Sequence, residues 1–233
     1  MRNYAAKIMA GFLALTAVCI IADGSSRMYY GFDSPDKQSQ LLEPSVQINK
    51  DCSATVIASD PLVGTWLVTA QHCVNGKKTG VINYATTVMD GVRFTVDIAY
   101  NVVDEDVKND LALIHTTTTG FAVAQVATEK PTEGQDTWTV GYPLGLPRQL
   151  TAGFYGLNMI VGDMDHQRAS DLIAGGNSGG GLFIIEDGVY KLVGVTSKGM
   201  VSQMIPSMFT PVGLYSELSP IRELIDRNLA NWE

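Results

Sequence analysis

Ser178 stands in the stretch AGGNSGGGLF, where five glycines surround one serine. A serine hydroxyl becomes a nucleophile toward a carbonyl carbon when a neighbouring base takes its proton. Glycines let the surrounding backbone adopt positive φ angles and let a second molecule approach closely, because they carry no Cβ. A glycine-rich loop without chemistry has the same composition, so the rest of the chain must distinguish the two interpretations.

Three histidines could serve as the base, His72, His115 and His166, and all of them precede Ser178. The segment GNSGG fits the G-x-S-x-G nucleophile elbow of α/β-hydrolases, but in those enzymes the histidine follows the serine. The order of residues therefore excludes that arrangement. The order Asp, His, Ser of the subtilisin type requires a parallel α/β sheet that the sequence does not indicate, so the order His, Asp, Ser remains.

His72 is the best placed of the three histidines. It follows an apolar run at 66–68 in TWLVTAQHCV, which predicts a strand that stops at small residues just before the imidazole. His115 lies inside the strand-like segment DLALIHT and is expected to be a partly buried strand residue. His166 lies in GDMDHQR, where we expect a solvated loop residue.

Asp110 is the preferred carboxylate partner for the histidine. It opens the apolar segment DLALI, so its side chain can point into a cleft while the strand behind it is buried. It follows the acidic segment NVVDEDVKN, whose residues Asp104, Glu105 and Asp106 we expect to form a solvated face.

The elements that must position these side chains are predicted to be strands. From Ser45 onward the chain contains short segments rich in Val, Thr and aromatic residues, separated by Gly, Asp or Asn. A charged Pro/Gly segment at 127–136 divides them into two sets, which indicates two antiparallel barrels. One helix is predicted at the end, with Ser219 as its N-cap and Pro220 in its first turn.

The N-terminus has the layout of a secretory signal. Arg2 and Lys7 precede an uncharged, mostly apolar stretch at 8–22, which is short for a membrane span, and the polar DGSS follows. An uncleaved signal anchor is the alternative. Cys19 is expected to be an apolar filler rather than a lipid attachment site. We therefore expect a secreted or periplasmic protein, or a membrane-anchored one with its catalytic domain outside the cytoplasm.

The composition limits the partners of the chain. Its 233 residues are 45% hydrophobic and carry a formal net charge of -8, which argues against nucleic acid or an anionic membrane surface as a main partner. No CxxC motif or histidine-rich cluster offers a metal site, and we expect no cofactor. In an exported chain Cys52 and Cys73 indicate a disulfide, whereas a reducing compartment would leave two free thiols.

Three motifs carry a family resemblance that runs from about Ser45 to the end of the chain. WLVTAQHCV resembles the histidine motif of trypsin-like, chymotrypsin-fold serine proteases, NDLALI resembles their aspartate motif and GGNSGGGLF resembles their serine motif. Asn177, together with TVGYPLGLPRQLTAG, makes the chain more similar to the bacterial HtrA and glutamyl-endopeptidase branches. Gly181 departs from the usual proline of the serine motif. The chain ends after the predicted helix, so we expect no PDZ domain.

The resemblance implies an all-β fold of two antiparallel six-stranded β-barrels of chymotrypsin type with a C-terminal α-helix. It implies an exported serine endopeptidase that cleaves polypeptides through His72, Asp110 and Ser178 and an acyl-enzyme intermediate. The backbone N–H groups of Gly176 and Ser178 would form the oxyanion hole. It also implies a disulfide between Cys52 and Cys73. A catalytically silent binding protein with a protease fold is the alternative.

The resemblance places the primary substrate pocket beside two segments. One is VTSKG at 195–199, which would pair with the substrate backbone. The other is Leu172, six residues before Ser178, near the usual pocket floor, where it suits an apolar or small side chain. Lys198 could attract an acidic side chain or simply be solvated. The predicted substrate-binding residues are Leu172, Thr196, Ser197, Lys198 and Gly199.

Asn177 separates this chain from the digestive members of the resembled family, in which an aspartate at this position pairs with a newly cut N-terminus. An uncharged Asn177 offers no counter-charge to a buried ammonium group. We therefore expect local hydrogen bonds and barrel packing to hold residues 174–178. The predicted boundaries are a signal peptide or anchor at 1–22, an irregular lead-in at 23–44, a first barrel at 45–126, a linker at 127–136, a second barrel at 137–218 and a helix at 219–233.

Overall fold

The computed structural model describes residues 40–89, 92–199 and 209–229. The predicted signal segment at 1–22, Cys19 and residues 23–39 of the lead-in lie outside the described residues. Within the described ranges, the helices are too short or too polar to cross a membrane.

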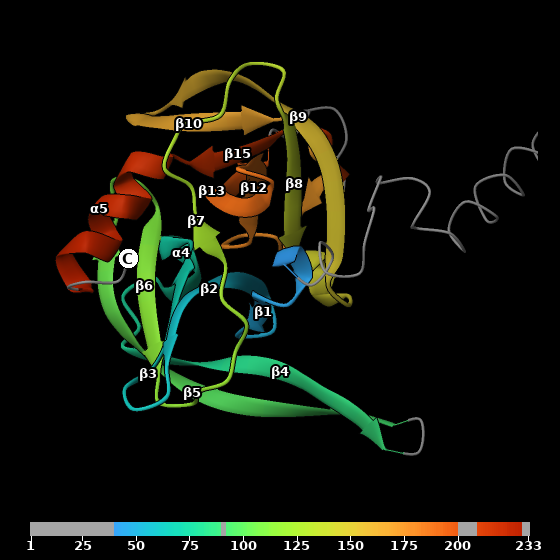
Figure 1. Cartoon of the computed structure of the whole chain (residues 1–233), viewed down its shortest axis with the longest axis vertical. Coiled ribbons are helices and arrows are strands. Elements are labelled where there is room, and N and C mark those ends of the chain that lie inside the picture. Colours follow the sequence, from blue (N-terminus) through green and yellow to red (C-terminus); the bar gives the residue numbers. More distant parts are fainter. Residues whose placement is uncertain (1–39, 90–91, 200–208, 230–233) are drawn as a thin grey trace, which may run out of the picture. The chain divides into compact units, whose positions relative to one another are not determined.

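The first half of the described chain is a closed antiparallel barrel. Its order is β1-β2-β3-β6-β5-β4, and β1 pairs with both β2 and β4, which closes the barrel. Figure 1 shows the hairpin of β4 and β5 extending beyond the other strands. The strands are β1 (Ser45–Ile48), β2 (Cys52–Asp60), β3 (Gly64–Thr69), β4 (Thr79–Met89), β5 (Val92–Asp106) and β6 (Leu111–Thr116).

The interior of this barrel is filled by apolar side chains from every strand. These side chains are buried because neighbouring strands direct them to the same face, and each contributes about 1.5–3 kcal/mol through burial. The packed residues include Val46, Ile48, Val56, Leu67, Ile82, Tyr100 and Ile114. The core fixes the paired strands β3 and β6. His72 follows the C-terminal end of β3, and Asp110 precedes the N-terminal end of β6.

The second half forms another closed ring of strands. β12 pairs with both β8 and β13, so the antiparallel order β12-β8-β9-β10-β15-β13 returns to its start, and β7 adds to β13 in parallel. The all-β prediction of two barrels is therefore confirmed. The strands are β7 (Gln125–Val126), β8 (Asp136–Gly141), β9 (Gln149–Val161), β10 (Met164–Ala169), β12 (Gly181–Glu186), β13 (Val189–Gly199) and β15 (Gly213–Ser216), while β11 (Ile173–Ala174) and β14 (Phe209–Thr210) form a separate pair.

The last helix, α5 (Leu218–Asn228), corrects one prediction. Its N-cap is Glu217, without a side-chain capping bond, and Ser219 is already inside the helix. The helix begins directly after β15, and Pro220 is tolerated there because the first N–H groups of a helix have no partner within it. Ile221, Leu224 and Ile225 of this helix are buried.

Candidate active site

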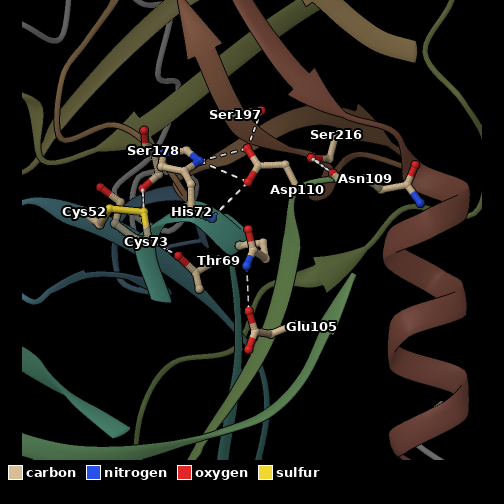
Figure 2. A network of polar contacts seen from close by, with 12 residues as sticks. Cys52, Thr69, His72, Cys73, Glu105, Asn109, Asp110, Ser178, Ser197 and Ser216 are labelled. Atoms are coloured by element: carbon tan, nitrogen blue, oxygen red, sulfur yellow. Dashed lines mark hydrogen bonds and ion pairs between the residues drawn. A yellow bond between two sulfur atoms is a disulfide. The ribbon is translucent and has the colours of Figure 1, made fainter. Parts of the chain in front are cut away.

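His72 lies in the short helix α4 (Gln71–Val74), which begins directly after β3 ends. The turn is tied to the residue before β6, because the Gln71 N–H donates to Asp110 O at 3.1 Å and the His72 N–H donates to Asp110 Oδ1 at 3.0 Å. The imidazole Nδ1 lies 3.0 Å from Asp110 Oδ1 and 2.9 Å from Oδ2 (Figure 2). The His72 side chain remains 46% exposed, so a ligand can reach the ring.

Asp110 is buried and has a left-handed backbone with φ of 51°. Aspartate tolerates this conformation better than most residues. Burial alone would raise the pKa of its carboxyl, but the hydrogen bonds from His72 and Ser197 lower that pKa by more, so the group lies below its usual range. The carboxylate is therefore held ionised beside the imidazole.

The acidic residues before Asp110 are not the solvated face that the sequence indicated. Asp104, Glu105 and Asp106 lie on β5 and are half-buried. Asp104 forms an ion pair with Arg227 of α5 at 2.6 Å. Glu105 accepts a hydrogen bond from the Gln71 side chain at 2.7 Å. Asp106 accepts hydrogen bonds from Asn109, three residues further on. The prediction was wrong because the side-chain partners of Asp104 and Glu105 lie far away in the sequence, where local acidity gives no sign of them.

The glycines beside Ser178 are required by space as well as by backbone angles. Gly176 has φ of 97°, and a Cβ there would lie 2.4 Å from Tyr142 O. Gly179 has φ of 84°, and a Cβ there would lie 2.1 Å from Ser53 O. Any side chain at either position would displace the backbone of the strand or loop that packs against it.

Hydrogen bonds from neighbouring segments hold residues 174–178, as predicted. The Leu144 N–H donates to Gly175 O at 2.5 Å, the Ser53 hydroxyl donates to Gly176 O at 2.7 Å, and the Ser53 N–H donates to Ser178 O at 2.7 Å. The Asn177 N–H donates to Ala174 O at 3.0 Å. Within the described ranges, neither the Gly176 N–H nor the Ser178 N–H donates to a backbone acceptor.

The disulfide between Cys52 and Cys73 is confirmed, with a Cα–Cα distance of 6.1 Å. Cys73 follows His72, and its Sγ contacts Ser178 O at 3.6 Å without a hydrogen bond, because a disulfide sulfur has no proton. Figure 2 shows Ser178 on one side of His72 and Asp110 on the other. The described part of the chain has no hydrogen bond between the Ser178 hydroxyl and His72.

The Cys52, His72 and Cys73 group is the candidate for metal binding among the described residues, with possible ligand atoms within 4.8 Å of one another. The two sulfurs are bonded to each other, and metal ions bind thiolates. The group therefore does not fit a metal ion.

A cleft of about 320 Å³ lies beside His72 and Asp110. Ser197 and Lys198, two of the predicted substrate-binding residues, line it, together with Val107 and Met164. The sequence did not single out Val107 or Met164. They come from the turn after β5 and from β10, and only the pairing of distant strands brings them together.

The other predicted substrate-binding residues lie elsewhere. Thr196 is buried, and its hydroxyl and N–H both donate to Gly180 O. Leu172 is 44% exposed and does not line this cleft, and neither does Gly199. Within the described residues, Lys198 and Gly199 pair with β15 alone, and Ser197 lies at an irregularity in that pairing. The opposite edge of residues 197–199 has no strand partner in the described ranges.

Two residues have environments that the sequence did not indicate. The Ser197 hydroxyl donates to Asp110 Oδ2 at 2.5 Å, in addition to lining the cleft. His166 is fully buried on β10 and is not a solvated loop residue. Burial and the nearby Lys198 lower the pKa of the His166 imidazole, which favours its neutral form. The exposed Asp165 beside it made its segment look solvated.

Comparisons with known proteins agree with this geometry. A family model described as a trypsin-like peptidase domain matches residues 52–195. No curated protein matches the chain.

Solved structures resemble the fold at low sequence identity. The Rv3671c protease in its inactive form, from M. tuberculosis, is 19% identical, with a TM-score of 0.62 over 82% of this chain and 92% of that one. The HtrA-type protease AlgW, solved with a tripeptide, is 17% identical, with a TM-score of 0.65 over 84% of this chain and 64% of that one. A serine endoprotease from Yersinia pestis is 16% identical, with a TM-score of 0.63 over 85% of this chain and 67% of that one. This chain therefore spans less than two thirds of AlgW.

Proposed function

Because the chain belongs to the trypsin-like peptidase family and is a serine endopeptidase, we propose that it hydrolyses polypeptides through His72, Asp110 and Ser178. The observation that carries this proposal is the bidentate contact of His72 Nδ1 with the buried Asp110 carboxylate. An ionised carboxylate at this position keeps the proton on Nδ1. Nε2 is then free to accept a proton from Ser178.

The reaction proceeds through an acyl-enzyme. Ser178 Oγ bonds to the carbonyl carbon of the substrate while His72 takes the hydroxyl proton. The C–N bond then breaks as His72 returns this proton to the leaving amine. In the second half, His72 takes a proton from a water molecule whose oxygen bonds to the acyl carbon. The ester bond to Ser178 then breaks, His72 returns the proton to Ser178 Oγ, and the product leaves with its new carboxyl group. Asp110 stabilises the imidazolium in both halves, supported by the low pKa of its carboxyl.

The oxyanion of each tetrahedral intermediate is bound by the N–H groups of Gly176 and Ser178. Their lack of backbone acceptors in the described part of the chain supports this role, because the donors remain free for a substrate oxygen. Each such donor contributes about 3–4 kcal/mol to the transition state.

The substrate binds as an extended strand along the free edge of residues 197–199. Substrate side chains then alternate between two faces, as in any strand. The cleft of Val107, Met164 and Lys198 takes a side chain on the His72 face, with an apolar wall and one ammonium group. Leu172, Thr196 and Gly199 belong to the primary pocket in this proposal, with Leu172 favouring an apolar or small side chain.

We assign the protein to an oxidising compartment outside the cytoplasm, secreted or periplasmic, with membrane anchoring through residues 8–22 as the alternative. The disulfide between Cys52 and Cys73 supports this assignment, because such bonds persist mainly in oxidising surroundings. Intact-mass measurement of protein recovered outside the cytoplasm, with and without reductant, tests the bond and the N-terminus together. Two free thiols would argue against the assignment.

Labelling with a fluorophosphonate tests the catalytic proposal. We expect the reagent to modify Ser178, and Ser178→Ala to lose both the label and the cleavage of fluorescein-labelled casein. A matched control is Ser219→Ala, which removes an exposed hydroxyl on α5 far along the chain from these motifs. A wild-type protein that is folded but neither labels nor cleaves would instead support a silent, protease-fold binding protein.

A further inference from the structure

Ser53 is fully buried at the start of β2, and three of its polar atoms are engaged with the active-site region. Its N–H donates to Ser178 O at 2.7 Å, and its carbonyl accepts from the Thr69 hydroxyl at 2.7 Å. Its hydroxyl donates to Gly176 O at 2.7 Å and accepts from the Tyr142 N–H at 2.9 Å. One residue of the first barrel therefore binds the carbonyls on both sides of Asn177.

The hydrogen bond from the Tyr142 N–H to the Ser53 hydroxyl links Ser53 to the peptide between Gly175 and Gly176 as well. Tyr142 is the residue before the single turn η1 (Pro143–Gly145), and the N–H of Leu144 in that turn donates to Gly175 O at 2.5 Å. Gly175 O and the Gly176 N–H belong to one planar trans peptide and point in opposite directions. Holding Gly175 O on one side therefore fixes the direction of the Gly176 N–H on the other.

The hydroxyl of Ser53 thus helps to hold the peptide that precedes Gly176 and the peptide that follows it. It binds the carbonyl of Gly176 directly, and through Tyr142 it anchors the turn that binds Gly175 O. Glycine rotates freely about its backbone bonds, and Gly176 has φ of 97°, so the peptides around it need external contacts to keep one orientation. Catalysis through an oxyanion hole requires donors that are already oriented when charge develops.

We propose that Ser53 is a positioning residue for the oxyanion hole, which fixes the peptide planes on both sides of Gly176 through its hydroxyl. This role rests on the proposed function, because it presumes that the Gly176 and Ser178 N–H groups bind the oxyanion. It also explains how the first barrel, which supplies the base, sets the geometry of a loop in the second barrel.

Ser53→Ala tests the role, with Ser45→Ala as the matched control. Ser45 is also a buried serine, on the neighbouring strand β1, but its hydroxyl has no hydrogen-bond partner within the described residues. For a peptide p-nitroanilide that the wild type cleaves, we expect Ser53→Ala to lower kcat about 10- to 100-fold with KM nearly unchanged. We expect Ser45→Ala to keep the wild-type kcat.

A transition-state analogue separates positioning from general damage. A peptide boronic acid forms a tetrahedral adduct whose oxygen occupies the oxyanion hole, and we expect Ser53→Ala to weaken its binding by the same factor as kcat/KM. The binding of the corresponding peptide acid, which makes no tetrahedral adduct, should remain unchanged. Equal weakening of both ligands, or wild-type kcat in Ser53→Ala, overturns the proposal.

Two further variants keep the test decisive if Ser53→Ala does not fold. Ser53→Thr and Ser53→Val have the same shape, but only threonine retains a hydroxyl. A higher kcat for the threonine variant supports the role, and equal values overturn it. Ser178→Ala is measured in the same assay: if it retains activity, the proposed function itself fails, whereas its loss of activity together with a fully active Ser53→Ala refutes only the role of Ser53.

Discussion

Ser197 and Asp110 join the two barrels at the carboxylate that contacts the imidazole. The Ser197 hydroxyl, on β13, donates to Asp110 Oδ2, the oxygen that also lies 2.9 Å from His72 Nδ1. Asp110 precedes β6 in the first barrel. The second barrel therefore contributes directly to the orientation and charge of a group in the first.

Ser197→Ala should lower kcat by about two- to tenfold, because it removes one of the hydrogen bonds that lower the Asp110 pKa and orient its carboxylate. Steady-state kinetics on a peptide p-nitroanilide measures the change. Ser219→Ala, which removes an exposed hydroxyl on α5, is the matched control and should have no such effect. An unchanged kcat in Ser197→Ala would mean that His72 alone orients Asp110.

Asp110→Asn should reduce kcat by on the order of 10⁴-fold, because an amide no longer holds the required tautomer of His72. Asp104→Asn is the matched control, since its carboxylate pairs with Arg227 and not with a histidine. The control should retain full activity and lose at most about 1 kcal/mol of stability, as is usual for a partly exposed ion pair. The reverse pattern would show that Asp104 is the carboxylate partner of the base.

Asp171→Asn should stabilise the protein at neutral pH. Burial raises the pKa of this carboxyl to about 6, although the Thr137 hydroxyl donates to it at 2.6 Å. An unfolded aspartate titrates near about 3.9, so the folded state holds its proton more tightly. The stabilising effect of the protonated form is complete below about 3.9 and is lost as the pH rises through about 6.

Thermal unfolding in a Ser178→Ala background, which prevents self-cleavage, measures this difference. The advantage of Asp171→Asn should grow between about pH 4 and 6 and then level off, reaching at most on the order of 3 kcal/mol. Asp187→Asn, on an exposed turn, is the control and should show no comparable rise. A stability difference independent of pH would contradict the raised pKa.

Replacing both Cys52 and Cys73 by serine should cost about 3 kcal/mol of stability, because the bond closes a loop of sequence separation 21. Activity should fall more than thermal stability alone predicts, since Cys73 adjoins His72 and Cys52 adjoins Ser53. Cleavage assays well below the unfolding temperature separate the two effects. Full activity there would show that the hydrogen bonds position His72 without the disulfide.

The fold and the contact between His72 and Asp110 were predictable because their signals are local, while the role of Ser178 stays a prediction. A strand that ends at small residues placed His72, an aspartate before an apolar run placed Asp110, and glycines around a serine placed Ser178. Strand periodicity and the break at 127–136 indicated two barrels. The start of α5 was missed by two residues because several neighbouring residues can cap a helix.

The supporting side chains could not be predicted, because their partners are set by strand pairing over long distances. Ser53 bonds to Gly176 across 123 positions, and Ser197 bonds to Asp110 across 87 positions. Neither serine has a distinctive local pattern. The burial of His166 likewise depends on β15 and β13, which follow it in the chain. The aspartate just before His166 in the sequence is exposed, but the His166 side chain is not.

The position of Ser53 has a consequence for how the chain is made. Synthesis presents the first barrel, with His72, Asp110 and Ser53, before Ser178 and the glycines around it emerge. The loop at 174–178 can be held only after β2 and β8 have both formed, since Ser53 and Tyr142 must meet. A half-finished chain thus carries a base without an aligned nucleophile. Under the proposed function, we therefore expect a chain whose barrels have not both closed to have no proteolytic activity of its own.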